Sequence, residues 1–244
     1  MGTYIRSQSA GEILRNSAHL YQQHFRKFFL TYLLPLFPFP IFYIVSVELQ
    51  SCVLMSIALI LMTTASLFAG IPITVMLSDI CLGNEPSVHR AYRRAFGRSA
   101  GQLIGTFFLY TGIVLGGFIL CIIPGLIFSI WYTFATIVVI LERLAGRRAL
   151  RRSKELGQGF YLRNFGVLFL CSMIVQVGSA LVGFALAQAA TALGLHNLVA
   201  GIPSMAVSLL LSPITLIAAV LLYYDMRARK EAYDSAALAE DLRR

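Results

Sequence analysis

Charged residues are scarce in this chain of 244 residues, where Asp, Glu, Lys and Arg together make up 13%. A soluble domain carries about 25% charged residues, so the composition argues against an ordinary soluble protein. The mean hydropathy is +0.76, and 58% of the residues are hydrophobic. Every Lys and Arg lies outside six long apolar segments. About 20 mostly apolar residues are enough to cross a membrane, so the sequence predicts an integral membrane protein.

Groups that would carry chemistry are also missing. There is no Cys-x-x-Cys pair and no glycine-rich phosphate loop with a lysine. No Ser/His/Asp or Cys/His arrangement can be proposed, so we expect no enzyme, no cofactor and no metal. The cysteines are expected to be small buried hydrophobes: Cys52, Cys81, Cys121 and Cys171. The histidines show no metal-ligand spacing: His19, His24, His89 and His196.

The basic residues indicate the topology. They lie in residues 6–27, 90–98, 143–163 and 227–244, and the other connections contain none. Because Lys and Arg favour the cytoplasmic side, we expect both termini there and three hairpins pointing outward. The outward connections are Glu48–Ser51, Pro124–Gly125 and Thr191–Gly201. The six expected spans are Phe28–Val47, Cys52–Ile80, Leu103–Ile123, Leu126–Leu141, Phe165–Ala190 and Ile202–Tyr224.

The fold class is therefore an all-α integral membrane protein with six transmembrane helices and amphipathic cytoplasmic helices before spans 1, 3 and 5. We expect a single domain, in which residues 1–27 form an amphipathic arm, 28–224 the bundle and 225–244 a cytoplasmic tail. In the arm, Ser9 and Glu12 fit a capping box, and Ile13, Ser17 and Leu20 follow a helical stripe. Two interpretations stay open: this helix lies in the headgroup plane, or it packs against the other cytoplasmic helices.

Three acids lie at the inward ends of the spans: Asp79, Glu142 and Asp225. Near the hydrocarbon boundary a carboxylate loses solvation, so each needs a cationic partner. The candidate partners are Arg93, Arg94, Arg151, Arg152 and Arg229. We expect these pairs to fix the basic helices to the spans. The alternative is that the acids converge on a cavity and form an ion or substrate site.

A dense basic cluster contains Arg147, Arg148, Arg151 and Arg152, in a chain with a formal net charge of +9. Guanidinium groups bind phosphate in two places, so the cluster predicts binding of anionic phospholipid headgroups. The alternative is a run that only orients the chain in the membrane. A membrane partner accounts for the basic balance, and nucleic acid is not expected.

Prolines and aromatics give weaker signals. Pro35, Pro38 and Pro40 should interrupt or bend the first span, because proline removes a backbone hydrogen bond. Broken spans form the sites of many transporters, although a kink is also an ordinary packing feature. Trp131 and Tyr132 follow the Pro124–Gly125 turn and are predicted to lie near the outer interface.

Two stretches of sequence carry a resemblance to a known family. In residues 142–156 a Glu is followed by Ala-Leu-x-Arg-Ser-x-x-Leu, and a Tyr-x-Asp-x-Arg motif closes the last span. Over roughly residues 100–235, the chain resembles the membrane domain of the glycerophosphoryl diester phosphodiesterase family and its stand-alone bacterial relatives. The residues that match are Glu142, Ala149, Leu150, Arg152, Ser153, Leu156, Tyr223, Asp225 and Arg227.

The resemblance implies a six-helix domain in a bacterial cytoplasmic (inner) membrane. It implies no enzyme, since the phosphodiesterase barrel is a separate domain. Our leading hypothesis is a non-enzymatic scaffold or accessory subunit that binds anionic lipid headgroups at its cytoplasmic face, with another membrane protein as a partner. The alternative is a transporter or channel for a lipid-derived or small solute that uses the proline-broken first span.

Overall fold

The computed structural model describes residues 4–95, 100–193 and 197–243. Within these ranges the regular structure is entirely α-helical, which confirms the all-α fold class. Residues 96–99 of the second basic segment, His196 and Arg244 lie outside the described part. The helices are α1 (Ala10–Gln23), α2 (Phe25–Leu36), α3 (Pro38–Glu48), α4 (Cys52–Cys81), α5 (Val88–Ala95), α6 (Ala100–Leu120), α7 (Ile122–Trp131), α8 (Ala135–Leu141), α9 (Arg147–Gly157), α10 (Tyr161–Ala192), α11 (Asn197–Glu231) and α12 (Ser235–Arg243).

Five stretches of the described residues are long and apolar enough to cross a membrane, so this is an all-α membrane protein. Three of them, in α4, α10 and α11, exceed the length that a hydrocarbon core of about 30 Å requires. The fourth expected span is made of α7 and α8 together. The stretches are Cys52–Cys81, Gly101–Leu120, Ile122–Leu141, Tyr161–Ala192 and Met205–Glu231.

The first expected span is divided into α2 and α3 at Phe37. Pro38 begins α3, where its missing N–H is tolerated because the first turn of a helix needs no such donor. Pro35 lies inside α2. The interruption predicted from the prolines is therefore present, and neither α2 nor α3 alone has the length of a full span.

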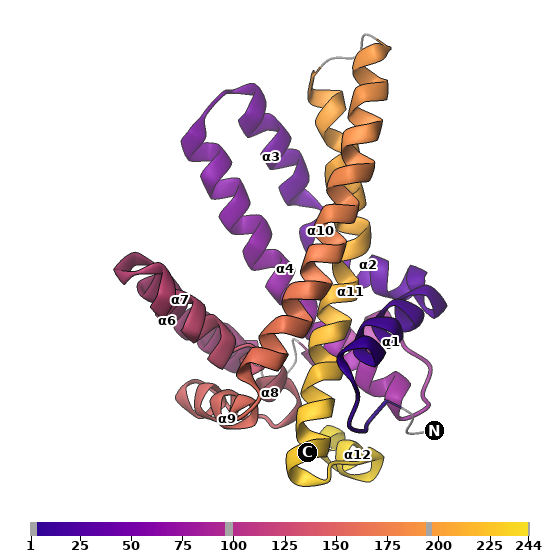
Figure 1. Cartoon of the computed structure of the whole chain (residues 1–244), viewed down its shortest axis with the longest axis vertical. Coiled ribbons are helices and arrows are strands. Elements are labelled where there is room, and N and C mark those ends of the chain that lie inside the picture. The colour runs from indigo at the N-terminus through magenta and orange to yellow at the C-terminus, as the bar shows by residue number, and fades with distance from the viewer. Residues whose placement is uncertain (1–3, 96–99, 194–196, 244) are drawn as a thin grey trace.

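The helices form pairs that diverge from one end of the molecule. Helices α10 and α11 pack along each other, α6 packs on α7, and α3 on α4. Figure 1 shows these pairs spreading apart, while the N and C marks both lie toward the lower end of the view, where α9 and α12 are also found. We call the end formed by α1, α5, α9 and α12 the basic end.

A core of large side chains forms near this end. It lies where α11 packs against α4, and its members include Met76, Leu77, Tyr223 and Tyr224, all fully buried. The Ser78 and Tyr224 hydroxyls are 2.7 Å apart and hydrogen-bond between the two helices. Burial of such aromatic side chains fixes the end of α11 that carries the charged residues described below.

Helix α1 has the predicted cap and buries its apolar stripe. Ser9 and Glu12 form the full capping box, and Ile13, Ser17 and Leu20 are buried. The packing partner is chiefly α11, and the Tyr21 hydroxyl donates to the Leu210 carbonyl. Helix α1 therefore packs mainly on α11, which contains a membrane-spanning stretch, and not mainly on the other basic helices, as one of the two interpretations predicted.

One local expectation, the turn at Pro124–Gly125, is wrong. The chain turns at Cys121, and Pro124 and Gly125 lie inside α7, because proline is tolerated in the first helical turn. The Trp131 ring contacts the basic end of the molecule, because the Lys154 ammonium of α9 sits 3.6 Å from its ring centroid. Helix α9 meets this region at the break between α7 and α8, where the Ser153 hydroxyl accepts from the Phe134 amide and donates to the Trp131 carbonyl.

Candidate functional site

The last turns of α11 hold together most of the basic end. Tyr223, Asp225, Arg227, Arg229 and Glu231 follow one another at every second position, and a helix turns by 100° per residue, so they point to different sides. Together they contact α9, α10, α12 and the loop after α8. Asp225 was expected at a helix end, but α11 continues to Glu231.

Asp225 is fully buried and receives three donors. The Arg163 guanidinium of α10 lies 2.6 Å from one carboxylate oxygen, and that of Arg229 lies 2.9 Å from the other. The Gln8 backbone amide donates to Asp225 at 2.7 Å. Both guanidiniums also donate to the Gln8 carbonyl, at 2.7 and 2.8 Å. The chain before α1 is thus bound to α10 and α11 through backbone atoms.

The sequence predicts the pairing of Asp225 with Arg229 but not its contacts with Arg163 and Gln8. The pairing with Arg229 could be expected because residues four apart are neighbours on a helix. Arg163 lies at the start of α10 and Asp225 near the end of α11, and these helices pack as a hairpin. In such a hairpin the start of the first helix lies beside the end of the second, so the sequence could have indicated that Arg163 and Asp225 meet. The contact of Gln8 uses backbone atoms, which no sequence pattern reveals.

Glu142 lies in the loop after α8 and contacts two helices. The Arg152 guanidinium of α9 is 2.7 Å from Glu142 and 2.5 Å from Glu231. The Tyr223 hydroxyl donates to the other Glu142 oxygen at 2.8 Å. Burial lowers the pKa of Arg152, but the hydrogen bonds and charges of Glu142 and Glu231 outweigh it and raise that pKa. Arg152 is thus held as a cation between two carboxylates.

Arg227 connects α11 to α12. Its guanidinium lies 2.6 Å from Asp241 and 3.7 Å from the Tyr233 ring centroid. The Tyr233 hydroxyl donates to the same Asp241 oxygen at 2.7 Å. Burial and this bond raise the pKa of Tyr233 well above its usual value. The Tyr-x-Asp-x-Arg motif therefore contacts three elements, through Tyr223, Asp225 and Arg227.

Asp79 has the weakest pairing of the three acids. Arg94 lies 3.4 Å and Arg90 3.9 Å from its two oxygens, and its Oδ2 makes no hydrogen bond within the described ranges. Arg93, the other candidate, is exposed and forms no ion pair with the described residues. The three acids contact separate groups, so they do not converge on one ion or substrate site.

The predicted basic cluster is divided by its contacts. Arg152 is held by the two glutamates, and Arg151 pairs with Glu155 at 2.9 Å on the exposed face of α9. Arg147 and Arg148 are exposed and have no ion-pair partner in the part of the chain that the structure describes. The charge that remains free to bind a ligand is therefore at the start of α9.

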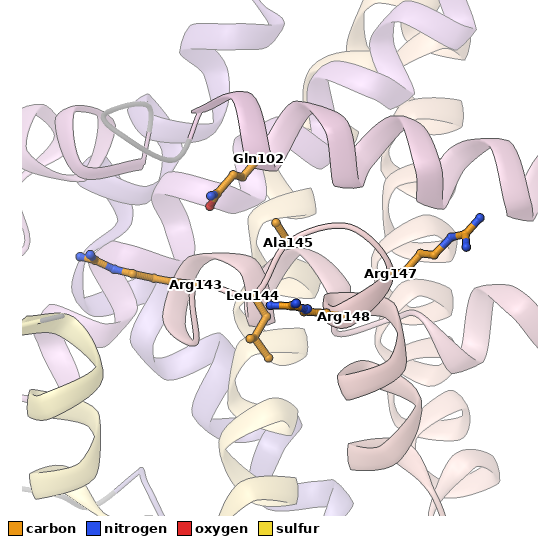
Figure 2. A pocket seen from close by; sticks show the side chains of 6 residues that line it. All are labelled: Gln102, Arg143, Leu144, Ala145, Arg147 and Arg148. Carbon is orange, nitrogen blue, oxygen red and sulfur yellow. The ribbon is translucent and has the colours of Figure 1, made fainter.

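Arg147 and Arg148 line an open pocket of about 390 Å³. In Figure 2 the side chains of Arg143 and Arg147 point away from each other, with Arg148 between them in this view, and Gln102 at the start of α6 points toward the loop. Arg143 is also exposed without an ion pair among the described residues. The full lining is Gln102, Arg143, Leu144, Ala145, Arg147 and Arg148.

The loop that shapes this pocket has an unusual backbone. Arg143 has φ 54° and Gly146 has φ 59°, both in the left-handed region. Such a conformation is unfavourable for a residue with a Cβ, so Arg143 is held by its surroundings. The Thr106 hydroxyl of α6 accepts from the Gly146 amide at 2.7 Å and fixes the loop to that helix. No sequence pattern indicates that Arg143, Gln102 and Thr106 belong to one site.

The arrangement can bind an anion through guanidinium and amide donors. In the described ranges no group of three His, Cys, Asp or Glu residues could hold a metal ion. Of the cysteines, Cys81 and Cys171 are buried as expected, while Cys52 and Cys121 are exposed. Cys52 begins α4 and Cys121 directly precedes α7, and neither lines the pocket.

Comparison with protein families identifies the group to which the chain is related. A family described as a domain of unknown function (DUF8558) matches residues 100–244. The chain belongs to the DUF8558 family. The part that matches begins at α6 and contains the pocket, Glu142 and Asp225, whereas Asp79 and its arginines precede it. No curated protein and no solved structure matches the chain.

Proposed function

We propose that this protein is a non-enzymatic membrane scaffold or accessory subunit that binds anionic phospholipid headgroups at its basic end. The observation that carries the proposal is the group of three exposed arginines around the pocket, Arg143, Arg147 and Arg148. Most other arginines of α9 to α11 are held by carboxylates. A surplus of unpaired positive charge at one pocket favours an anionic ligand.

The position of the pocket supports a lipid over a free phosphate. Gln102 and Arg147 bring the start of α6 and the start of α9 to the same pocket, and α6 leads into an apolar stretch long enough to span the membrane. Along that helix Ile104 and Phe108 are exposed. A lipid phosphate in the pocket would place its acyl chains along these side chains. Each Lys or Arg near an anionic leaflet adds about 1 kcal/mol of attraction.

The location follows from the same charges. With the basic end on the cytoplasmic side of a bacterial inner membrane, as the positive-inside rule favours, the pocket faces the anionic inner leaflet. Both ends of the described chain lie at that side of the molecule. The resemblance to the phosphodiesterase membrane domain supports this setting and supports an accessory role, because that domain is found beside a separate enzyme.

The test is lipid retention by the purified protein. The protein is extracted in mild detergent, mixed with phosphatidylglycerol or phosphatidylcholine, and analysed by native mass spectrometry. The Arg147→Gln/Arg148→Gln double variant should lose most bound phosphatidylglycerol, on the order of a thirtyfold decrease for two charges of about 1 kcal/mol each. The matched control is Arg151→Gln, which removes an exposed charge from the same helix outside the pocket.

The outcomes differ clearly. Loss of phosphatidylglycerol in the double variant alone supports the proposal, and binding of both lipids alike in every variant contradicts it. Inorganic phosphate added at high concentration should not displace the lipid, since it lacks the acyl chains; displacement would indicate a free-phosphate site. A protein that co-purifies at fixed ratio would identify the partner of an accessory subunit.

One observation favours the alternative, a transporter or channel for a lipid-derived or small solute. Between α2 and α3, Pro38 has no N–H and so interrupts the helical hydrogen bonding within an apolar region, and backbone groups freed at membrane depth are tolerated only against protein or a water-lined cavity. Solute flux into proteoliposomes separates the two functions. A flux that Pro38→Ala reduces, with lipid retention unchanged, would favour transport.

A further inference from the structure

Helix α10 carries a glutamine between two small residues along one line of an otherwise apolar sequence. Ser172, Gln176 and Ala180 belong to the same series of every fourth residue, which Phe184 and Gln188 continue. Residues spaced by four form one of the ridges through which helices pack on each other. We call Ser172, Gln176 and Ala180 the Gln176 ridge.

The described part of the chain leaves most of the ridge uncovered. Gln176 and Ala180 are exposed, and Ser172 is half-buried. In the ranges that the structure describes, the Gln176 carboxamide makes no hydrogen bond. The main neighbour of α10 is α11, and the residues of α10 buried there, such as Val175 and Ser179, lie on another face.

Gln176 lies inside the hydrocarbon core wherever along α10 the membrane-spanning part of this helix begins. Helix α10 has 32 residues, or about 48 Å at 1.5 Å per residue. A core of about 30 Å takes about 20 of these residues. If the core began at Tyr161 it would end at Ala180, and if it ended at Ala192 it would begin at Met173. Residues 173–180, and Gln176 among them, lie within it in both cases.

A carboxamide facing lipid in this region has no water and no partner. Transfer of an amide from water to an apolar medium without a hydrogen bond costs a few kcal/mol. Within a membrane, Gln side chains are instead found between helices, where they hydrogen-bond across the contact. The exposed Gln176 therefore indicates a partner helix that the described residues do not supply.

We infer that the Gln176 ridge is the contact surface between two copies of this chain. Copies in one membrane share the same orientation, so a twofold axis along the membrane normal brings each residue to its counterpart at equal depth. A carboxamide is both donor and acceptor. Two Gln176 side chains across the axis can satisfy each other, whereas a different protein would need a polar group of its own at that depth.

The small residues fit the same arrangement. Ser172 and Ala180 lie one turn before and after Gln176 on the ridge, and small side chains there let the two helix backbones approach closely. The neighbouring exposed side chains Met173 and Phe184 are apolar and would pack around the polar contact. The inference rests on α10 alone and does not depend on lipid binding at the pocket.

Cross-linking in native membranes tests the contact. In the full chain with its four native cysteines replaced by Ala, Gln176→Cys and Ala180→Cys are treated with a short bifunctional thiol reagent. The control is Ile174→Cys, which is exposed at nearly the same depth but two residues away and so about 200° around the helix. A dimer of the chain should form with Gln176→Cys and Ala180→Cys, and not with Ile174→Cys.

A second measurement leaves the cysteines unchanged. The dimer fraction in lipid bilayers is followed by single-molecule photobleaching as the protein is diluted. Gln176→Leu should raise the dissociation constant about tenfold, from the loss of two interhelical hydrogen bonds, while Ile174→Ala leaves it unchanged. Equal cross-linking at the three positions, cross-linking of another protein at Gln176→Cys, or a monomer at all dilutions would each overturn the inference.

Discussion

The Tyr223 hydroxyl of α11 donates a 2.8 Å hydrogen bond to Glu142, which follows α8 and lies 81 positions earlier in the chain. Tyr223 is fully buried, so no water competes for the bond. The same carboxylate pairs with Arg152 of α9. One contact therefore connects α11 to the loop between α8 and α9, the loop that also forms the arginine pocket.

Removal of this hydroxyl should destabilise the protein. Tyr223→Phe keeps the ring but leaves a Glu142 oxygen without its donor, and hydrogen bonds to charged groups contribute about 1.5–3 kcal/mol. We expect a loss of about 2 kcal/mol, measured as a lower thermal unfolding midpoint in detergent. In the control, Tyr161→Phe, the lost bond to the Lys154 carbonyl is exposed, so the midpoint should fall by much less. Equal shifts would show that Tyr223 does not hold the loop.

Asp225→Asn should be the most harmful change of a single acid. The carboxylate is fully buried between Arg163 and Arg229, and removal of one partner of a buried pair leaves uncompensated charge that costs about 3 kcal/mol. The side-chain NH₂ group of the new Asn is a donor, so it cannot accept the hydrogen bond that the Gln8 backbone N–H now donates to the Asp225 carboxylate. We expect a marked loss of folded protein, measured as the monodisperse fraction on size exclusion.

Substitutions of two other acids give the comparison for the Asp225→Asn result. Asp79→Asn should cost less than Asp225→Asn, because its arginines lie at 3.4 and 3.9 Å. Glu155→Gln should cost under about 1 kcal/mol, since its pair with Arg151 is exposed. If Asp225→Asn folds as well as Glu155→Gln, the acids do not fix the basic helices to the spans.

The structural features that depend only on residues close together in the chain could be predicted from the sequence. The Ser9 and Glu12 capping box, the Asp225–Arg229 pair and the interruption of the first span all follow from spacings of a few residues. Apolar length predicted the spanning helices in the same way. These features need no knowledge of how distant segments meet.

The features that depend on contacts between distant segments of the chain were not predicted. Gly125 was expected in a turn, yet it lies in α7, where a Cβ would come within 2.5 Å of the Phe118 ring, so glycine is needed for close packing. Arg163 meets Asp225 only because α10 and α11 align at that depth. Arg143 belongs to the pocket through a left-handed backbone that no local pattern indicates.

That backbone gives a prediction that separates stability from ligand binding. Arg143→Gly and Arg143→Ala both remove a guanidinium from the pocket, so both should reduce phosphatidylglycerol retention equally. Only the Ala variant keeps a Cβ at φ 54°, which costs roughly 1–2 kcal/mol in the left-handed region. The Gly variant should therefore unfold at the higher temperature. Equal midpoints would mean that the loop relaxes, and retained lipid in both would exclude Arg143 from the site.

The capping box predicts a dependence on pH. Hydrogen bonds with the backbone and side chain of Ser9 hold the pKa of Glu12 below its usual value of 4.5. The carboxylate therefore stabilises α1 above about pH 4.5, and this contribution is lost as the pH falls through the lower folded-state pKa. Amides of α1 should exchange hydrogen faster in Glu12→Gln than in the wild type at about pH 7, and this difference should shrink as the pH falls further below about 4.5. A difference that persists in acid would contradict this account.

Helix α12 should detach when Asp241 loses its charge. Asp241 accepts from Arg227 at 2.6 Å and from the Tyr233 hydroxyl at 2.7 Å, and Arg227 keeps a second partner in Glu231. In Asp241→Asn the charge-assisted bond weakens, while the rest of α11 stays paired. Limited proteolysis should cut residues 232–243 at least about tenfold faster, for a loss of about 1.4 kcal/mol or more. Glu85→Gln, an exposed carboxylate far along the chain, is the control. Equal cleavage in both variants would show that α12 is held by its apolar contacts instead.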